Sequence, residues 1–151
     1  MDFYYKIHSV HLAPITLAYA ANISNHMQWN SRIADIKRLT GHGCSIGTQW
    51  LVSAQYLGGM RNLTLTVTHQ QGDVILVSGH NNEGRTRCEI FQTWRVEPKK
   101  RGSLLHYHLK IQVEGWGILN FLLRLLLART MSQTAYRLQQ KLSGALPTNK
   151  N

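Results

Sequence analysis

The chain has 151 residues, the length of one ordinary domain, and is long enough to enclose a core or a cavity. Hydrophobic residues make up 43% of it and charged residues 16%, a composition that excludes an intrinsically disordered chain. The formal net charge of +10 would attract nucleic acid or an anionic membrane, but the basic residues are spread along the sequence. Only Lys99-Lys100-Arg101 is a tight cluster, which we expect in a solvated hairpin loop, with a phosphate-binding patch as the alternative.

The sequence indicates one cytoplasmic domain. The segment MDFYYKIHSVHL at the start contains no basic region followed by a long apolar run, so no signal peptide is evident. Cys44 and Cys88 are too few for a disulfide framework, and we expect both to be reduced thiols. Because no repeat, low-complexity tract or proline-rich linker interrupts the chain, we predict a single domain over residues 1–146 and a flexible tail over residues 147–151.

A first strand and two short helices are expected in the N-terminal part. The first helix begins at Pro14 and runs to Ala21, since proline is favoured at the first position of a helix. At Asn22-Ile23-Ser24-Asn25 this helix gives way to a second short helix, which carries Trp29.

The middle of the chain predicts successive antiparallel strands, because apolar and polar residues alternate there with a period of two. Strands are expected over residues 48–56, 62–69, 74–80, 85–98 and 104–113. Turns at residues 57–59, 71–73 and 81–84 separate the first four of these strands, and each turn contains glycine. The alternation gives the sheet one dry face and one wet face.

The last element, over residues 116–142, is the longest and would measure roughly 40 Å if it were helical throughout. Its predominantly apolar part, from Trp116 to Ala128, has 13 residues and contains Arg124, whereas a membrane-spanning helix needs about 20 apolar residues. We therefore predict no membrane span. The order of elements predicts an α+β fold in which a curved antiparallel sheet of about seven strands has its dry face covered by this helix.

Three features of the sequence resemble the SRPBCC superfamily, which includes START-related lipid-transfer domains, birch-pollen-allergen-like proteins and polyketide cyclase/dehydrase-type proteins. Ala13-Pro14 opens a short helix, Trp29 follows about fifteen residues later, and Gly47-Thr48 begins a strand. The resemblance implies a helix-grip fold, with an apolar cavity between a seven-stranded sheet and the long helix. Ser24-Asn25-His26 stands where many relatives have an acidic residue, and no motif marks a catalytic member.

The strand and helix periods predict which residues would line such a cavity. The alternative is that the same side chains fill a solid core. A lining that is mostly apolar, with few polar groups, suits a hydrophobic small molecule. The predicted lining residues are Trp50, Val52, Leu63, Leu65, Val67, Ile90, Trp94, Tyr107, Leu109, Ile111, Phe121, Arg124, Ala128 and Met131.

The position of Arg124 within the apolar helix allows three interpretations. At 100° per residue it shares a face with Ala128, Met131 and Ala135, opposite a set of four leucines at 119, 122, 123 and 126. The helix could be kinked so that the leucines belong to the core, or the leucines could be exposed and form a homodimer or membrane contact. In the third interpretation, which we adopt as the prediction, Arg124 borders the cavity and meets an anionic group of the ligand.

We therefore predict that the protein binds or carries a hydrophobic small molecule, such as a lipid, a quinone or a polyketide-like compound. One alternative is a polyketide cyclase, aromatase or dehydratase that uses Arg124, Tyr107 and Tyr56 as polarising or proton-transfer groups. The other is a basic adaptor for an anionic membrane or RNA. No nucleic-acid-binding signature is present, which disfavours nucleic acid as a partner. No cofactor or metal is predicted, since His106 and His108 would supply only half of a metal site.

Overall fold

The computed structural model describes residues 1–56, 59–81, 87–114 and 119–146 of the chain. The side chains of Tyr56 and of residues 119–123 are also outside the description. The expected tail over residues 147–151, most of the turns at residues 57–59 and 81–84, and the predicted helix start at Trp116 therefore lie outside the described residues.

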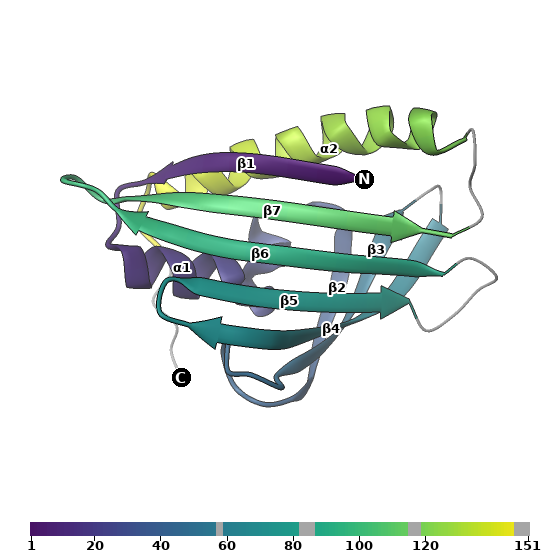
Figure 1. Cartoon of the computed structure of the whole chain (residues 1–151), viewed down its shortest axis with the longest axis horizontal. Helices are drawn as coiled ribbons and strands as arrows, with labels where there is room; N and C mark the ends of the chain where they lie inside the picture. Colours follow the sequence, from purple (N-terminus) through teal and green to yellow (C-terminus); the bar gives the residue numbers. More distant parts are fainter. Residues whose placement is uncertain (57–58, 82–86, 115–118, 147–151) are drawn as a thin grey trace.

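Seven strands form one antiparallel sheet, in the spatial order β1-β7-β6-β5-β4-β3-β2 (Figure 1). The strands are β1 (Asp2–Ser9), β2 (Ile33–Thr40), β3 (Gln49–Tyr56), β4 (Gly59–Gln71), β5 (Val74–Asn81), β6 (Cys88–Pro98) and β7 (Ser103–Val113). The helices are α1 (Ala13–Ala21), the 3-10 helix η1 (Ile23–Gln28) and α2 (Leu119–Leu142). β1 joins the sheet beside the last strand, with Tyr5 opposite Tyr107. This arrangement confirms the predicted α+β helix-grip fold.

The alternation along the central strands has the predicted phase. On β7 the residues Leu105, Tyr107, Leu109 and Ile111 are buried, whereas the residues between them are partly exposed. The same division runs through β4 and β6, so one face of the sheet carries the core. A strand with this alternation can bury only one of its faces, and the helices lie on that face.

The edge strand β2 was not identified from the sequence. Only Ile33 and Ile36 are partly buried on it, so the apolar residues do not alternate with a period of two. Its pairing with β3 shifts register twice, between Ile33 and Asp35 and between Arg38 and Thr40. Such bulges bend and twist a strand, which curves this end of the sheet around the core.

The helices are fastened to one another and to the sheet. α1 packs against β5, β6 and β7, and η1 packs against β2. The amide of Asn25 donates a hydrogen bond to the Tyr19 carbonyl (3.0 Å), and His26 Nε2–H donates one to the Ala20 carbonyl (2.9 Å). Two carbonyls that the end of α1 leaves without helical partners are therefore satisfied by side chains of η1. η1 ends at Gln28, so Trp29 follows the second helix instead of lying within it.

α2 lies along β1 and presents the predicted stripe to the core (Figure 1). Four of its predicted residues, Met131, Ala135, Leu138 and Leu142, are buried, and the fifth, Ala128, is partly buried. Leu127, which was not predicted to belong to the stripe, is buried as well. The amide of Val10 donates a hydrogen bond to the Leu142 carbonyl at 3.1 Å, which ties the end of the helix to the chain that follows β1. No helix in the described part of the chain is both long enough and apolar enough to cross a membrane.

The turn between β6 and β7 depends on Gly102, which has φ of +87° and would bring an added Cβ into collision with the Ser9 carbonyl oxygen. We expect Gly102→Ala to lower the free energy of unfolding by about 3 kcal/mol or more, because left-handed strain and backbone crowding add together. Gly43→Ala is the matched control, since Gly43 also has positive φ (+52°) but no atom lies within 4 Å of its added Cβ. It should cost about 1 kcal/mol. Urea unfolding measures both, and equal losses would contradict the crowding.

Candidate functional site

A central cavity of about 30 Å³ lies between the inner face of the sheet and α2. A volume of this size holds about one or two water molecules. Most of its wall comes from the strands, a smaller part from η1 and the residues after it, and the rest from α2. The lining residues are His26, Trp29, Asn30, Ile33, Val52, Ala54, Leu63, Leu65, Ile90, Gln92, Tyr107, Leu109, Met131 and Thr134.

The residues predicted to line a cavity separate into three groups in the structure. Those on the cavity wall are Val52, Leu63, Leu65, Ile90, Tyr107, Leu109 and Met131. Those in the core beside it are Trp50, Val67, Trp94 and Ile111, which are buried, and Ala128, which is partly buried against the core. The side chain of Phe121 lies outside the described residues, and Arg124 lies elsewhere.

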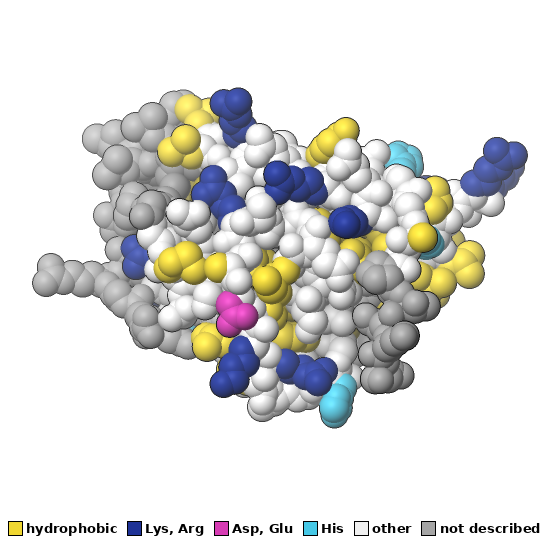
Figure 2. Space-filling model, turned by 180° about the vertical axis from the view of Figure 1, so that it is seen from behind, with side chains coloured by type: hydrophobic (Ala, Val, Ile, Leu, Met, Phe, Trp, Pro, Cys, Tyr) yellow, Lys and Arg dark blue, Asp and Glu magenta, His cyan; other side chains and the backbone are white. Residues whose placement is uncertain are grey.

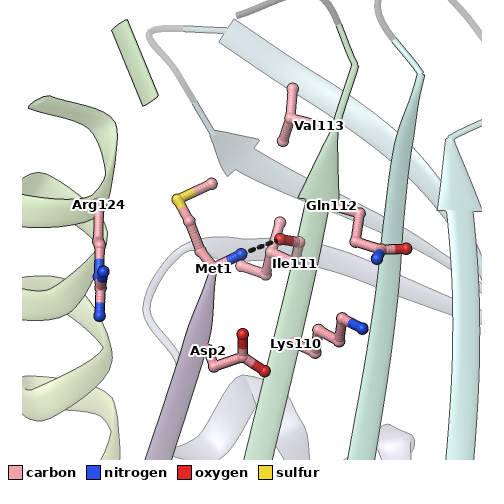
Figure 3. A pocket seen from close by; sticks show the side chains of 7 residues that line it. All are labelled: Met1, Asp2, Lys110, Ile111, Gln112, Val113 and Arg124. Carbon is pink, nitrogen blue, oxygen red and sulfur yellow. Dashed lines mark hydrogen bonds between the residues drawn. The ribbon is translucent and has the colours of Figure 1, made fainter. Parts of the chain in front are cut away.

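Arg124 is exposed and borders a second, open hollow of about 500 Å³, not the central cavity. The hollow is also lined by Met1, Asp2 and the end of β7 from Lys110 to Val113. Figure 3 shows Arg124 on α2 across from Met1 and Ile111. Arg124 was predicted to border the cavity between sheet and helix, but the structure places it beside this open hollow instead. Periodicity along a helix does not report how far the helix lies from the strands.

The leucines that were placed opposite Arg124 are only partly described. Leu126 has 70% of its surface exposed, as its helical phase predicts, and the neighbouring Leu125 is exposed as well. The side chains of Leu119, Leu122 and Leu123 lie outside the described residues. A homodimer or membrane contact through these leucines stays a prediction.

Five polar or aromatic residues of the cavity wall were not identified from the sequence: His26, Trp29, Asn30, Gln92 and Thr134. Gln92 gave a usable signal, since it occupies an inward position of β6 between two buried apolar residues. His26, Trp29 and Asn30 lie in or after a 3-10 helix, where no simple period tells the inner side from the outer.

Aromatic rings form one side of the site. Trp94 and Tyr107 stack with 3.9 Å between ring centroids and an angle of 8° between planes. The ring of Trp29 meets Trp94 edge-on at 6.2 Å, and His26 lies 4.4 Å from Trp29. Interlocked rings of this kind lose few rotamers and make a rigid, apolar wall.

His26 is an uncharged member of this wall. Its Nε2–H donates a hydrogen bond to the Ala20 carbonyl, and burial lowers the pKa of the imidazole to about 3. A histidine with so low a pKa stays neutral near neutral pH and is a weak base there. It therefore acts as a hydrogen-bonding and packing group.

Solved structures of other proteins share this architecture over nearly the whole chain. A START superfamily protein from Mycobacterium smegmatis has a TM-score of 0.71 and 15% identity, with 93% of this chain and 96% of that one covered. TTHA0849 from Thermus thermophilus has a TM-score of 0.72 and 13% identity, with 94% and 97% covered. Ara h 8.0201 has a TM-score of 0.64 and 13% identity, also with 94% and 97% covered. The chain has the SRPBCC fold.

At these identities the similarity establishes the SRPBCC fold and not a ligand or an activity. No protein-family profile matches the chain, and no curated protein matches its sequence. The site must therefore be interpreted from its own residues.

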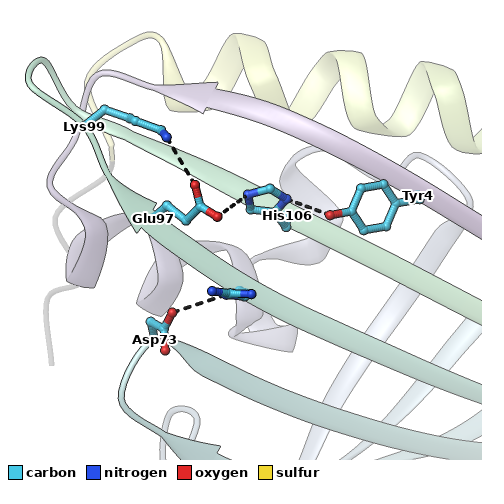
Figure 4. Close-up of polar contacts among 6 residues, drawn as sticks. Tyr4, Asp73, Glu97, Lys99 and His106 are labelled. Carbon is cyan, nitrogen blue, oxygen red and sulfur yellow. Dashed lines mark hydrogen bonds and ion pairs between the residues drawn. The ribbon is translucent and has the colours of Figure 1, made fainter.

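The outer face of the seven-stranded sheet carries a series of connected polar contacts (Figure 4). Tyr4 Oη and His106 Nδ1 share a hydrogen bond at 2.7 Å, and His106 Nε2 lies 3.2 Å from Glu97 Oε1. Lys99 Nζ donates to the other carboxylate oxygen at 3.1 Å, and this hydrogen bond lowers the pKa of Glu97. His108 pairs separately with Asp2 at 3.1 Å. Within the described ranges, no three histidine, cysteine or acidic residues come together as a metal site.

Neither cysteine offers an activated nucleophile. Both thiols are free and partly buried. Burial raises the pKa of the Cys44 thiol to about 11 and also raises the pKa of Cys88. A thiol with a raised pKa holds its proton at neutral pH, and the thiolate is the reactive form.

The basic cluster lies where the sequence placed it, in the exposed turn between β6 and β7. Lys99 forms an ion pair with Glu97. Lys100 and Arg101 are the other two basic residues of that turn. On the face shown in Figure 2 the lysine and arginine side chains are scattered, with apolar surface between them. Exposed charges spread in this way make a weaker anion-binding surface than a single patch does.

Burial of neutral His26 makes a prediction about acid stability. Its pKa is about 3 in the fold and about 6.5 in the unfolded chain, so between these values the unfolded state binds more protons. The stability that His26 provides is present above pH 6.5 and is lost as pH falls toward 3, at up to about 1.4 kcal/mol per pH unit. His26→Gln keeps a hydrogen-bond donor for the Ala20 carbonyl. It should remove the contribution of His26 to the slope of the free energy of unfolding against pH.

The control for this prediction is His80→Gln, because His80 is exposed on β5. Urea unfolding at several pH values between 3.5 and 6.5 compares the wild type with both variants. His80→Gln should retain the wild-type slope. If His26→Gln retained it too, the histidine would not be buried in its neutral form.

Proposed function

We propose that the protein binds a hydrophobic small molecule in the central cavity between the sheet and α2. The observation that supports the proposal is a partly enclosed space on the inner face, whose wall is mostly apolar and comes mainly from strands. Pockets for small ligands have this composition, with a few polar groups that fix the orientation of the ligand. The SRPBCC fold, which the chain shares with a START superfamily protein, is consistent with it.

The cavity has to widen for this function, because about 30 Å³ holds water and a drug-sized ligand needs about 300 Å³ or more. On the helix side the wall consists of Met131 and Thr134. The remaining wall belongs to strands and to the η1 segment, where the backbone is held by the sheet ladder and the α1 contacts. In our proposal α2 moves outward, since that movement enlarges the cavity without breaking strand pairing.

Binding without turnover accounts for the site better than catalysis does. Of the groups considered for a cyclase-type enzyme, Tyr107 lines the cavity and Arg124 borders the separate hollow. The side chain of Tyr56 lies outside the described residues. The one histidine on the wall, His26, is held neutral by burial. The described part of the wall therefore supplies orientation and not an acid–base pair.

The proposal is tested with 2-isopropenylnaphthalene, a fluorescent hydrocarbon without polar atoms. We expect saturable binding of one molecule per chain, measured by fluorescence titration. Leu65→Trp places a larger side chain on the cavity wall and should weaken binding at least tenfold, while overpacking costs about 1–3 kcal/mol of stability.

Ile75→Trp is the matched control, because Ile75 is buried on the inner face but does not line the cavity. It should cost a similar amount of stability and leave the affinity for the hydrocarbon within about twofold. Binding is compared at a temperature where circular dichroism shows both variants folded. Absence of binding to the wild type, or equal weakening by both substitutions, would refute the proposal.

A further inference from the structure

Three tryptophans with buried side chains differ in how their indole N–H groups are bonded. Trp50 Nε1–H donates to Ser24 Oγ at 3.1 Å, and Trp94 Nε1–H donates to Gln92 Oε1 at 3.2 Å. Trp29 is also buried, with 2% of its surface exposed, but its Nε1–H meets no acceptor among the described residues. A buried donor without a partner costs about 1–3 kcal/mol, so such groups are rare unless an occupant supplies the acceptor.

Trp29 lines the central cavity, whereas Trp50 and Trp94 do not. The indole without an acceptor is thus the one beside the space that an occupant would fill. The Nε1 atom is itself buried, so an acceptor reaches it only when the cavity widens, as the proposed function requires.

Two amide side chains of the wall, Gln92 and Asn30, each have their oxygen oriented by a hydrogen-bond donor of the protein. Gln92 receives Trp94 Nε1–H on its Oε1, and since an indole only donates, the amide oxygen must face Trp94. Asn30 receives the backbone N–H of Arg32 on its Oδ1 at 3.1 Å. Both amide oxygens therefore already accept a hydrogen bond within the protein, and the NH2 groups are the donors that these two side chains can offer an occupant.

Among the described residues of the cavity wall there is no lysine, arginine, aspartate or glutamate, and His26 is neutral. A carboxylate or phosphate placed there would be a buried charge without a counter-ion, which is strongly unfavourable. The acceptor that suits these donors is therefore an uncharged oxygen.

We infer that the cavity selects ligands with a neutral carbonyl oxygen, held by Trp29 Nε1–H with the amides of Asn30 and Gln92 beside it. This specificity rests on the proposed function and adds to it the chemical class of the ligand: an apolar, ring-containing ketone, ester or amide. Trp29 supplies the discriminating hydrogen bond. The aromatic wall of His26, Trp29 and Tyr107 supplies the apolar contact.

The test uses two probes of nearly the same shape, 2-acetylnaphthalene, which has a carbonyl, and 2-isopropenylnaphthalene, which has a CH2 group in its place. Wild-type protein should bind the ketone about tenfold more tightly, the ratio that one added hydrogen bond of ordinary strength gives. Trp29→Phe keeps an aromatic ring and removes the donor, so it should bring the ratio of the ketone affinity to the hydrocarbon affinity down to about one, whatever change it makes to the hydrocarbon affinity itself.

Trp50→Phe is the control, because it removes a buried indole N–H that does not line the cavity. It should retain the preference for the ketone. A readout on the wild-type protein, independent of any substitution, is the ¹H–¹⁵N resonance of the Trp29 indole. We expect this resonance to shift when the ketone is added and to shift less with the hydrocarbon.

The outcomes separate the inference from the function on which it rests. If the hydrocarbon binds but the wild type shows no preference for the ketone, the inference fails and the proposed function stands. The same holds if Trp29→Phe keeps the preference, or if the Trp29 resonance responds equally to both probes. If neither probe binds, both proposals fail.

Discussion

The structure depends on the need to cover one dry face of a wide sheet. Seven strands about 4.8 Å apart span roughly 29 Å, whereas a helix with its side chains is about 10–12 Å across. One helix therefore cannot cover the face. α2 lies along β1, α1 packs against β5 to β7, and η1 packs against β2. The cavity is lined by strands of the sheet, by η1 with the residues that follow it, and by α2.

The junction between α1 and η1 determines what the cavity presents to an occupant. α1 ends with carbonyls that lack helical partners, and the side chains of Asn25 and His26 satisfy two of them. These hydrogen bonds fix η1 over the sheet, and Trp29 and Asn30 follow directly from it. A requirement of helix termination thus brings an indole N–H and an amide to the wall of an otherwise apolar space.

The described charged residues lie apart from the cavity. The net charge of +10 is carried by the surface, where Lys99 pairs with Glu97 and Arg124 borders an open hollow. The described residues that line the cavity carry no charge, since none is acidic, lysine or arginine and burial keeps His26 neutral. A site of this kind distinguishes ligands by shape and by neutral hydrogen bonds, not by long-range attraction. The basic surface and the cavity are therefore separate features of the protein.

The sequence by itself determined the order of the elements, the inward face of β4, β6 and β7, and the buried stripe of α2, since each of these follows from a local period. It did not reveal β2, because this exposed edge strand has no alternation of apolar and polar residues. It also did not reveal that Trp29 and Asn30 line the cavity, because they lie in an irregular segment without a period. Only the tertiary structure decided that Arg124 faces an open hollow and that the cavity is small. Both depend on the distance between helix and sheet, and a residue's phase within its own element gives its direction and not that distance.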